Sequence, residues 1–322
     1  MVFNFSNYSV LIIGDVMLDR YVSGRVTRIS PEAPVPVVEK ERDWHVLGGA
    51  ANVAANVRSI GACCKVFGVV GDDDEAEYLK AILRTEQIAY CFFVDGKNTT
   101  VKMRVLGNDQ QIVRIDKDLF FDWNAVEDNK RQSYMREVMS DIASYDVVVL
   151  SDYGKGFLSE DFCSQIIQEC DKQCVPVIVD PKDGDWKKYY GASCIKPNLF
   201  ELAKQCQIEN PHLLSYSELK KECFCLLEKY DFANVFLTRG AEGALLVQEN
   251  DAVFAFPARK VEVSDVSGAG DTACAVLAVC TAQGLPLSVG GYFATLAATL
   301  VTTKKGTQTI RWEEVQTAED EN

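Results

Sequence analysis

The sequence Asp-Val-Ser-Gly-Ala-Gly-Asp-Thr at residues 265–272 sets small residues directly before an aspartate, and a largely apolar stretch follows. Small residues that open a helix leave several backbone N–H groups without partners, and these groups and the helix dipole attract an anion. We therefore expect an anion hole at Gly268, Ala269 and Gly270. Asp271 could accept a proton from a substrate hydroxyl beside this hole, which suits phosphoryl transfer to an alcohol. The alternative is a helix cap without a function.

Length and charge limit the classes of protein to consider. The 322 residues are enough for one large α/β domain or two smaller ones. The net charge of −14 argues against a nucleic-acid partner or an anionic membrane, so an anionic substrate would need a locally basic site. No apolar run reaches the roughly 18–20 residues that span a bilayer, and residues 1–10 lack the pattern of a signal peptide. We expect a cytoplasmic protein.

Twelve cysteines invite a disulfide or metal interpretation, but their spacing argues against both. No pair has the C-x-x-C spacing, and His45 and His212 are the only histidines. Most of the cysteines stand in apolar surroundings. We expect buried, reduced thiols, in keeping with the cytoplasm.

Short runs rich in β-branched residues alternate along the chain with amphipathic stretches. This alternation is typical of a doubly wound α/β fold, a mostly parallel sheet flanked by helices. Ligands on such sheets bind beyond the carboxyl ends of the strands, where Asp15, Asp152, Asp180, Asn198 and Arg239 fall. The expected strands are 8–13, 65–70, 146–150, 176–180, 194–196 and 235–238. The expected helices are 50–60, 74–85, 124–143, 160–174, 200–206 and 217–230.

Two regions interrupt the alternation. Residues 20–46 are extended and contain prolines that block a helix, and residues 91–116 alternate between apolar and polar side chains. We interpret both as strands of a small β-sheet lid over the mouth of the main sheet. No internal repeat or flexible linker is visible, so we expect one domain over residues 1–322.

The stretch Gly-Gly-Ala-Ala-Asn-Val-Ala-Ala-Asn at residues 48–56 joins a glycine pair to a helix of small residues. Glycine lets a ligand approach the backbone, and the Asn52 amide offers a donor and an acceptor to a hydroxyl. Asp15 and Asp19, near the end of the first strand, could accept hydrogen bonds from sugar hydroxyls. Tight helix packing and turn or cap aspartates are the alternatives.

Two further motifs stand at strand ends. Asn198 and Glu201 lie three residues apart, which suits either a magnesium ion held through water or a helix cap. The sequence Thr-Arg-Gly-Ala-Glu-Gly at residues 238–243 suits either a nucleotide phosphate or a plain hairpin. A P-loop and the protein-kinase motif set are both missing, so a nucleotide would need the hole at the 265–272 motif. The nucleotide candidates in these two motifs are Asn198, Glu201, Thr238, Arg239, Gly240 and Gly243.

The 48–56 and 265–272 motifs, in this order and separation, resemble the two signatures of the ribokinase (PfkB) family of sugar kinases. The sequence Asn-Leu-Phe-Glu from Asn198 is similar to the N-x-x-E motif that this family associates with magnesium. The stretches ISPEAPVPV from Ile29, QQIVRID from Gln110 and SDYGKG from Ser151, with KMR and DPK, resemble the heptose-7-phosphate kinases more narrowly. Those enzymes phosphorylate the anomeric hydroxyl of D-glycero-β-D-manno-heptose 7-phosphate. No H-x-G-H motif follows, so we expect a stand-alone kinase or an excised kinase domain.

The resemblance implies a ribokinase-like fold, ATP and Mg²⁺ as cofactors, and a monovalent cation such as K⁺ as a further candidate. It implies that Asp271 is the base and that Asn198 and Glu201 organise magnesium. Unpaired strand edges in the lid lead us to expect a homodimer through the lid. The sugar hydroxyls would be held by Asp15, Asp19, Gly48, Gly49, Asn52 and Asp152. The candidates for the 7-phosphate are Lys102, Arg104, Arg114, Lys155 and Lys182.

Overall fold

The computed structural model describes residues 3–108, 110–182 and 184–321. Within these ranges the main sheet has nine strands in the order β13-β12-β11-β10-β9-β8-β1-β4-β5. All neighbouring strands from β5 to β11 are parallel, whereas β12 and β13 are antiparallel. The strands are β1 Ser9–Gly14, β4 Cys63–Val70, β5 Ala89–Val94, β8 Val147–Ser151, β9 Val177–Asp180, β10 Cys194–Ile195, β11 Asn234–Thr238, β12 Ala244–Gln248 and β13 Val253–Phe256.

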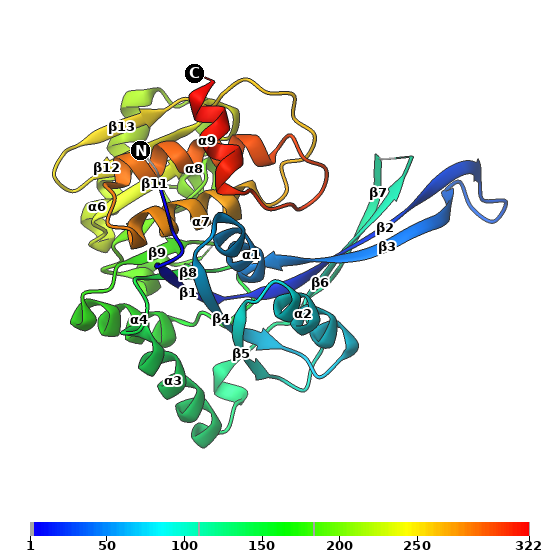
Figure 1. The fold of residues 1–322 in the computed structure, drawn as a ribbon, viewed down its shortest axis with the longest axis horizontal. Coiled ribbons are helices and arrows are strands. Elements are labelled where there is room, and N and C mark those ends of the chain that lie inside the picture. Colours follow the sequence, from blue (N-terminus) through cyan, green and yellow to red (C-terminus); the bar gives the residue numbers. More distant parts are fainter. Residues whose placement is uncertain (1–2, 109, 183, 322) are drawn as a thin grey trace.

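Helices cover both faces of this sheet, as the alternation in the sequence predicts (Figure 1). Alternate residues of β1 point to opposite faces, so Val10 and Ile12 join one hydrophobic core while Leu11 and Ile13 join the other. The first core includes side chains of α1 Ala50–Ile60, α2 Asp74–Thr85, α7 Ala269–Ala282, α8 Leu287–Val301 and α9 Trp312–Asp320. The second includes side chains of α3 Asp128–Ile142, α4 Glu160–Gln173, α5 Leu199–Gln205 and α6 Tyr216–Tyr230.

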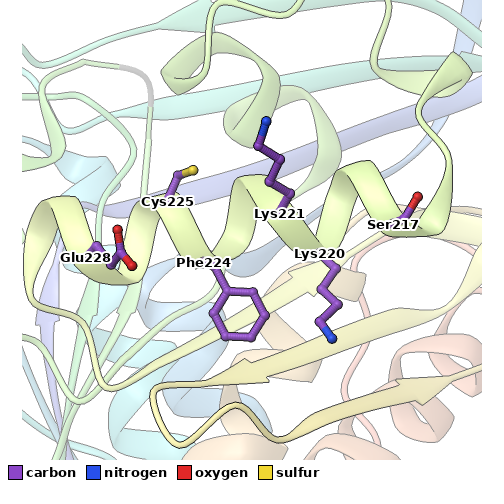
Figure 2. Close-up of a pocket in the computed structure, with 6 residues that line it drawn as sticks. All are labelled: Ser217, Lys220, Lys221, Phe224, Cys225 and Glu228. Atoms are coloured by element: carbon purple, nitrogen blue, oxygen red, sulfur yellow. The ribbon is translucent and has the colours of Figure 1, made fainter.

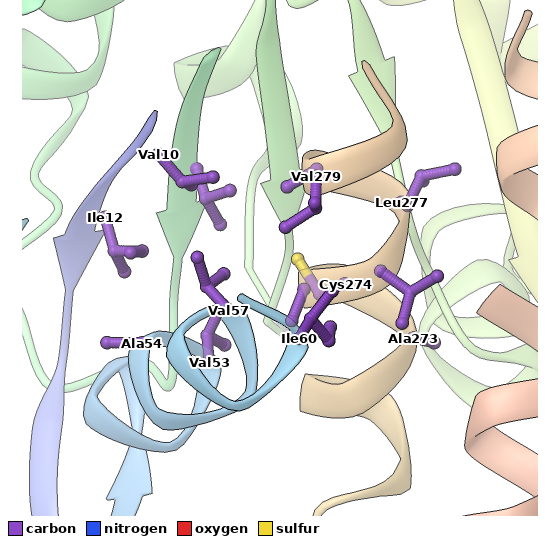
Figure 3. Packing of buried hydrophobic residues seen from close by; sticks show 14 of the residues in the cluster. Val10, Ile12, Val53, Ala54, Val57, Ile60, Ala273, Cys274, Leu277 and Val279 are labelled. Atoms are coloured by element: carbon purple, nitrogen blue, oxygen red, sulfur yellow. The ribbon is translucent and has the colours of Figure 1, made fainter. Parts of the chain in front are cut away.

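The first core packs α1 and α7 together against β1. Figure 3 shows Val53 and Val57 of α1 beside Cys274 of α7, with Ile12 of β1 close by. Each fully buried aliphatic side chain of this kind contributes about 1.5–3 kcal/mol relative to an exposed one. This packing fixes the start of α7 beside the start of α1, and both helix starts carry predicted site residues.

The helix predictions agree with the structure to within one residue, except at one start. The expected helices at 50–60 and 74–85 coincide with α1 and α2. The helix expected from residue 124 begins only at Asp128, because a 3₁₀ turn at Trp123–Ala125 precedes it. The Asp122 carboxylate accepts from the backbone N–H of Asn124 and holds that turn.

A second sheet projects from the body as a long arm, the lid (Figure 1). In the described residues it has the order β3-β2-β6-β7, formed by β2 Val16–Ile29, β3 Pro36–Gly49, β6 Val101–Gly107 and β7 Gln110–Lys117. The prediction that the second lid segment begins at residue 91 is wrong. Residues 91–94 belong to β5, which pairs with β4 at the edge of the main sheet. An edge strand is half-exposed, so its alternation resembles that of a lid strand.

All twelve cysteines lie in the described ranges and carry free thiols. Burial raises the pKa of Cys64, Cys170 and Cys280 to about 12, so these thiols stay protonated and unreactive at neutral pH. Of the helices that the structure describes, none combines the length and apolarity needed to cross a membrane.

Candidate active site

Asp271 lies in the first turn of α7 and contacts two other elements. Gly268, the N-cap residue, has a φ of +81°, and none of the described side chains caps the helix. Asp271 is only 6% exposed. Its Oδ2 accepts a hydrogen bond from Nδ2 of Asn52 on α1 at 2.6 Å, and its Oδ1 accepts one from the Tyr153 hydroxyl at 2.5 Å. The expected base is therefore buried and held by donors at both oxygens.

Burial sets the protonation of this carboxyl. Desolvation, with the charge of nearby Asp180, raises the pKa of Asp271 from 3.8 to about 6. The hydrogen bonds from Tyr153 and Asn52 and the charge of Lys196 oppose this shift. A carboxyl with a pKa near 6 is ionised at neutral pH, yet it is a stronger base than an exposed aspartate.

The small residues at the start of α7 leave little space between it and α1. A Cβ on Gly268 would lie 2.9 Å from Nδ2 of Asn52, and a Cβ on Gly270 would lie 3.7 Å from Nζ of Lys196. Close packing against Asn52 therefore explains Gly268, and the Ala269 N–H donates to the Val266 carbonyl at 3.3 Å. The anion hole expected at Gly268, Ala269 and Gly270 stays a prediction.

Lys196, just beyond β10, is a buried cation beside this helix start. It is 3% exposed, and its Nζ lies 2.9 Å from Oδ1 of Asp180. Burial would lower the pKa of Lys196, but the Asp180 carboxylate outweighs it and holds the pKa above the ordinary value, so the amine stays charged. Lys196 therefore places a cation beside the start of α7, in an ion pair with Asp180.

Asp15 is the single residue between β1 and β2. Its Oδ2 accepts from the backbone N–H groups of Tyr153 (2.8 Å) and Lys155 (3.1 Å). Its Oδ1 is buried and has no hydrogen-bond partner among the described residues. Burial, with the charge of Asp152, raises the pKa of Asp15 to about 6. A buried oxygen without a partner is costly, so it is well suited to accept a ligand hydroxyl.

Asp19 lies on the first part of β2, at the root of the lid, and is held by two neighbours. Its Oδ1 forms an ion pair with Nη1 of Arg104 on β6 at 3.0 Å, and its Oδ2 accepts from the Thr307 hydroxyl at 3.0 Å. Thr307 also exchanges hydrogen bonds with the Tyr21 hydroxyl. This network joins the lid root to the segment after α8.

Gly48 and Gly49 end β3 where it leads into α1. A Cβ on Gly48 would lie 2.8 Å from Cγ of Met17, and a Cβ on Gly49 would lie 2.4 Å from the carbonyl oxygen of Asp15. Close packing of the lid root therefore explains both glycines. Their predicted contact with sugar hydroxyls stays a prediction.

The candidate cations on the lid share one face but differ in burial. The strand register places Lys102, Arg104 and Arg114 on this face, because Asp19 pairs with Lys102 and Arg104 pairs with Arg114. Lys102 lies over the Tyr153 ring, with Nζ 5.2 Å from the ring centroid. The side chain of Arg114 is 51% exposed and forms an ion pair with Asp116 on its own strand.

Three candidates near the strand ends are already engaged by protein groups. Nζ of Lys155 lies 2.7 Å from Oδ2 of Asp118, and Nζ of Lys182 lies 3.8 Å from Oε1 of Glu201. Asp152 pairs with Lys188, accepts from the Tyr189 hydroxyl at 2.6 Å and caps the backbone N–H of Gly154. Asp152 therefore organises its loop.

Asn198 and Glu201 form a capping box at the start of α5. The Asn198 Oδ1 accepts from the N–H of Glu201, and Oε2 of Glu201 accepts from the N–H of Asn198. The cap interpretation of this motif is thus present in the structure. Burial and the charge of Asp180 raise the pKa of Glu201. A divalent cation would relieve this crowding of carboxylates, so the residues fit magnesium bound through water.

A site built from direct metal ligands has no support. The described chain contains no group of three or more His, Cys, Asp or Glu side chains able to hold a metal ion. Magnesium keeps most of its water and needs few protein ligands, so a water-mediated site stays compatible with Asn198 and Glu201.

The segment after β11 turns back into the antiparallel β12. Asn198 forms a β-bridge with Thr238, which brings the two strand-end motifs together. The Arg239 guanidinium donates to Oε2 of Glu242 at 3.0 Å. Gly240 has a φ of +56°, and a Cβ on Gly243 would lie 1.9 Å from the carbonyl oxygen of Phe256. A hairpin explains these glycines, and a contact with nucleotide phosphate stays a prediction.

The hollow drawn in Figure 2 does not belong to this cluster. All of its lining residues come from one face of α6, including Lys220, Lys221 and Phe224. It shares no residue with the surroundings of Asp271, so it has no part in the chemistry discussed here.

The whole-chain comparison decides the family. The pattern of the pfkB family carbohydrate kinases matches residues 7–314. This chain belongs to that family. Kinases of the family use ATP with Mg²⁺ and transfer a phosphoryl group to a sugar.

Sequence relatives are similar over most of the chain. Bifunctional protein HldE of Actinobacillus pleuropneumoniae serotype 5b is 37% identical over 315 residues, which cover 98% of this chain and 64% of that protein. Bifunctional protein HldE of Hydrogenovibrio crunogenus is 38% identical over 309 residues, which cover 95% and 62%. The PfkB chain thus spans less than two thirds of the length of these relatives.

Solved structures agree with the fold. Phosphofructokinase-2 from Escherichia coli, in complex with potassium, has a TM-score of 0.78 at 17% identity and covers 96% of this chain and 97% of its own. Arabidopsis thaliana ribokinase, complexed with ribose and ATP, has a TM-score of 0.75 at 18% identity and covers 96% and 98%. The expected ribokinase-like α/β fold with a β-sheet lid is confirmed.

Sequence reasoning about this PfkB chain missed two residues at the site. Tyr153 lies within the SDYGKG stretch, and Lys196 opens the stretch that contains Asn198, yet neither received a role. Both follow strand ends, which is the signal that could have found them.

Proposed function

We propose that this PfkB kinase transfers the γ-phosphoryl group of ATP to the anomeric hydroxyl of D-glycero-β-D-manno-heptose 7-phosphate, on the route to ADP-heptose for the lipopolysaccharide core. The observation that carries kinase chemistry is Asp271, buried at an uncapped helix start with a raised pKa. The heptose assignment is supported by the stretches that resemble heptose-7-phosphate kinases and by similarity to proteins named HldE. Because those relatives are longer, the proposal covers the kinase reaction alone.

In the proposed reaction Asp271 is the general base. The Oδ1 of Asp271 takes the proton of the anomeric hydroxyl as its oxygen bonds to the γ-phosphorus, and the bond from that phosphorus to the bridging oxygen of ADP breaks. Asn52 holds the other carboxylate oxygen and so fixes the direction of Oδ1. The backbone at Gly268, Ala269 and Gly270 stabilises the charge on the transferring group.

ATP with Mg²⁺ supplies the phosphoryl group and part of the charge neutralisation when bound. In this proposal Asn198 and Glu201 orient the water shell of the metal, and Thr238, Arg239, Gly240 and Gly243 border the nucleotide. Lys196 adds a buried positive charge near the phosphate. We place the reaction in the cytoplasm, where ATP is available and thiols stay reduced. A dependence on K⁺ is part of the proposal, and its test is the rate in K⁺ against Na⁺.

The sugar would contact both carboxylates at the lid root. Oδ1 of Asp15 lacks a partner among the described residues and so suits a hydroxyl, and a Cβ on Gly48 would lie 3.2 Å from Oδ1 of Asp19. In this proposal Asp19, Asn52 and the Gly48–Gly49 backbone contact the same sugar. We assign the 7-phosphate first to Lys102 and Arg104, which share the lid face that carries Asp19. Arg104 is itself paired with Asp19 at 3.0 Å, so the phosphate would share this guanidinium with the carboxylate. Lys155 and Lys182 are secondary candidates because they lie outside the lid strands and are paired with Asp118 and Glu201, and Arg114 is the weakest because it is half-exposed.

The test is substrate competition. Purified protein is given ATP, Mg²⁺ and either heptose 7-phosphate, ribose or fructose 6-phosphate, and ADP release and product phosphorylation are measured. We expect kcat/KM for heptose 7-phosphate to exceed the others by at least about 10²-fold, since buried polar groups reject substrates that leave them unpaired. A preference for another sugar would show that this chain is a PfkB kinase with a different substrate. Sugar binding without ATP consumption would show a binding protein.

We also propose a homodimer formed through the lid. The outer strand β7 has an unpaired edge in the described chain, and Ile112, Val113 and Ile115 on it are 38–49% exposed. A related structure, phosphofructokinase-2 from E. coli, is described as tetrameric. Light scattering at working concentration should give twice the monomer mass, and Val113→Glu should shift the protein toward the monomer. A monomeric mass for the unchanged protein would contradict the proposal.

A further inference from the structure

Tyr153 donates a hydrogen bond to the oxygen of Asp271 that the proposed reaction needs. Its hydroxyl lies 2.5 Å from Oδ1, while Asn52 already occupies Oδ2. No motif in the sequence assigns a role to this tyrosine. Both carboxylate oxygens of Asp271 therefore accept hydrogen bonds from protein donors.

The protein holds Tyr153 from its other side as well. Its backbone N–H donates to Oδ2 of Asp15 at 2.8 Å, which fixes the residue just beyond the end of β8. Burial, with the charges of Asp271 and Asp180, raises the pKa of Tyr153 well above 10. The hydroxyl therefore keeps its proton at neutral pH and acts toward Asp271 as a donor only.

We propose that Tyr153 is a positioning residue that occupies Oδ1 of Asp271 until the sugar hydroxyl replaces it, and so limits transfer of the phosphoryl group to water. This inference rests on the proposed role of Asp271 as base. A water molecule near Oδ1 must compete with a short hydrogen bond from a side chain that the backbone holds in place. A sugar hydroxyl held by Asp15 and Asn52 competes better, because binding has already restricted its position.

The lid offers a way to couple this exchange to sugar binding. Nζ of Lys102, on lid strand β6, lies 5.2 Å above the Tyr153 ring. A cation over a tyrosine ring stabilises that ring position. A sugar phosphate that attracts Lys102 would remove this contact and make Tyr153 easier to displace, so Asp271 becomes free when the acceptor arrives.

The side reaction that Tyr153 limits is the hydrolysis of ATP. A water oxygen bonds to the γ-phosphorus, the bond to the ADP oxygen breaks, and one water proton goes to Asp271, which gives ADP and inorganic phosphate. The step uses the same base as sugar phosphorylation, so both can be measured on one protein.

The experiment measures inorganic phosphate release from ATP and Mg²⁺ with no sugar present, for the unchanged protein and for Tyr153→Phe. Phenylalanine keeps the ring and removes the hydroxyl. We expect hydrolysis to rise about tenfold in Y153F and to fall to background in the double variant with Asp271→Asn, because general-base assistance contributes about 10²–10⁴-fold.

A matched control removes a different buried tyrosine hydroxyl. Tyr134 donates to the backbone carbonyls of Gly68 and Cys91, outside the site, so Tyr134→Phe should leave sugar-free hydrolysis unchanged. Thermal unfolding shows whether each variant folds. A second readout is the pH profile: the Tyr153 hydrogen bond lowers the pKa of Asp271, so the acidic limb of Y153F should move to higher pH.

Two results would overturn the proposal. One is a folded Y153F protein whose sugar-free hydrolysis equals or falls below that of the unchanged protein. The other is a rise in Y153F that survives Asp271→Asn. Neither depends on which sugar the kinase uses, so a wrong heptose assignment would be seen separately, in the substrate competition.

Discussion

Two helices, α5 and α7, begin at segments that the sequence marks as functional, and their first turns differ. At α5 Asn198 and Glu201 bond to each other's backbone N–H groups, so the helix start is closed by its own residues. At α7 no described side chain caps Gly268, and Asp271 reaches Asn52 and Tyr153 on other elements. A helix start can bind an anion only if the helix leaves its N–H groups free. At α7 the Ala269 N–H donates to the Val266 carbonyl at 3.3 Å, and none of the described groups accepts from the N–H of Gly270 or Asp271. The comparison therefore favours α7 for the proposed anion hole, whereas α5 combines a helix cap with the proposed magnesium role of Asn198 and Glu201.

The change with the largest expected effect is Asp271→Asn. Without a base, we expect turnover to fall about 10³-fold while sugar and ATP still bind. The measurement is steady-state turnover together with calorimetric binding of each substrate. Near-normal turnover in a folded variant would remove Asp271 from this role and end the contrast between the two helix starts.

Gly268→Ala should have the next largest effect. Its Cβ would lie 2.9 Å from Nδ2 of Asn52 at a residue with φ +81°, so Asn52 and Asp271 must shift. We expect turnover to fall about 10–10²-fold, because small misplacements at a reacting centre are costly. The matched control is Gly284→Ala at the other end of α7, where φ is +73° and a Cβ meets no described atom within 4 Å. The control variant should lose stability while its turnover stays unchanged.

The pH profile tests the protonation of the buried carboxyls of Asp271 and Asp15. Burial raises the pKa of both Asp271 and Asp15 to about 6, and Asp271 must be ionised to act as the proposed base. We expect kcat/KM to fall as the pH drops through about 6. A folded-state pKa above the ordinary 3.8 favours the folded state while the carboxyl is protonated, so this stability is lost as the pH rises through about 6. Constant activity down to pH 5 would contradict the raised pKa values.

Asn198→Ala should have the smallest effect. It tests the comparison of the two helix starts at α5, whose first turn is capped by its own residues. Removal of an N-cap costs about 1 kcal/mol of stability. We expect a lower Tm and, if Asn198 also orients the magnesium shell, a higher Mg²⁺ concentration for half-maximal rate. A lower Tm with an unchanged Mg²⁺ requirement would leave Asn198 as a cap alone.

Local patterns predicted most of the fold. The helices at α1 and α2 were expected at their observed bounds, and the alternation of strands and helices predicted the doubly wound sheet. The order of the strands in the sheet was not predicted and is seen only in the structure. The error at residues 91–94 arose because an edge strand of the main sheet and a lid strand share the same half-exposed pattern. Pairing partners across a sheet are not encoded in one strand, so sequence periodicity could not separate the two.

The site was predictable where one motif contains the residue. Asp271 and Asn52 were expected separately, and the packing of α1 on α7 brings them to 2.6 Å. Tyr153 and Lys196 enter the site from other strands, and their roles depend on what lies opposite them in space. Arg114 shows the converse difficulty: its charge suggested a ligand site, and the sequence pattern did not show that Asp116 on the same strand pairs with it. Its role stays a prediction.

Two of the connections between the lid and the body are very short. Asp15 alone separates β1 from β2, and Gly49 at the end of β3 is followed at once by α1, with the Ala50 N–H bonded to the Asp15 carbonyl at 3.0 Å. A swing of the arm would involve backbone torsions at Asp15 and Gly49 together with the segments 95–100 and 118–122, which join β6 and β7 to the body. If Asp15 holds the sugar, as proposed, one residue both connects arm to body and contacts the substrate, so substrate binding and arm angle are coupled through it.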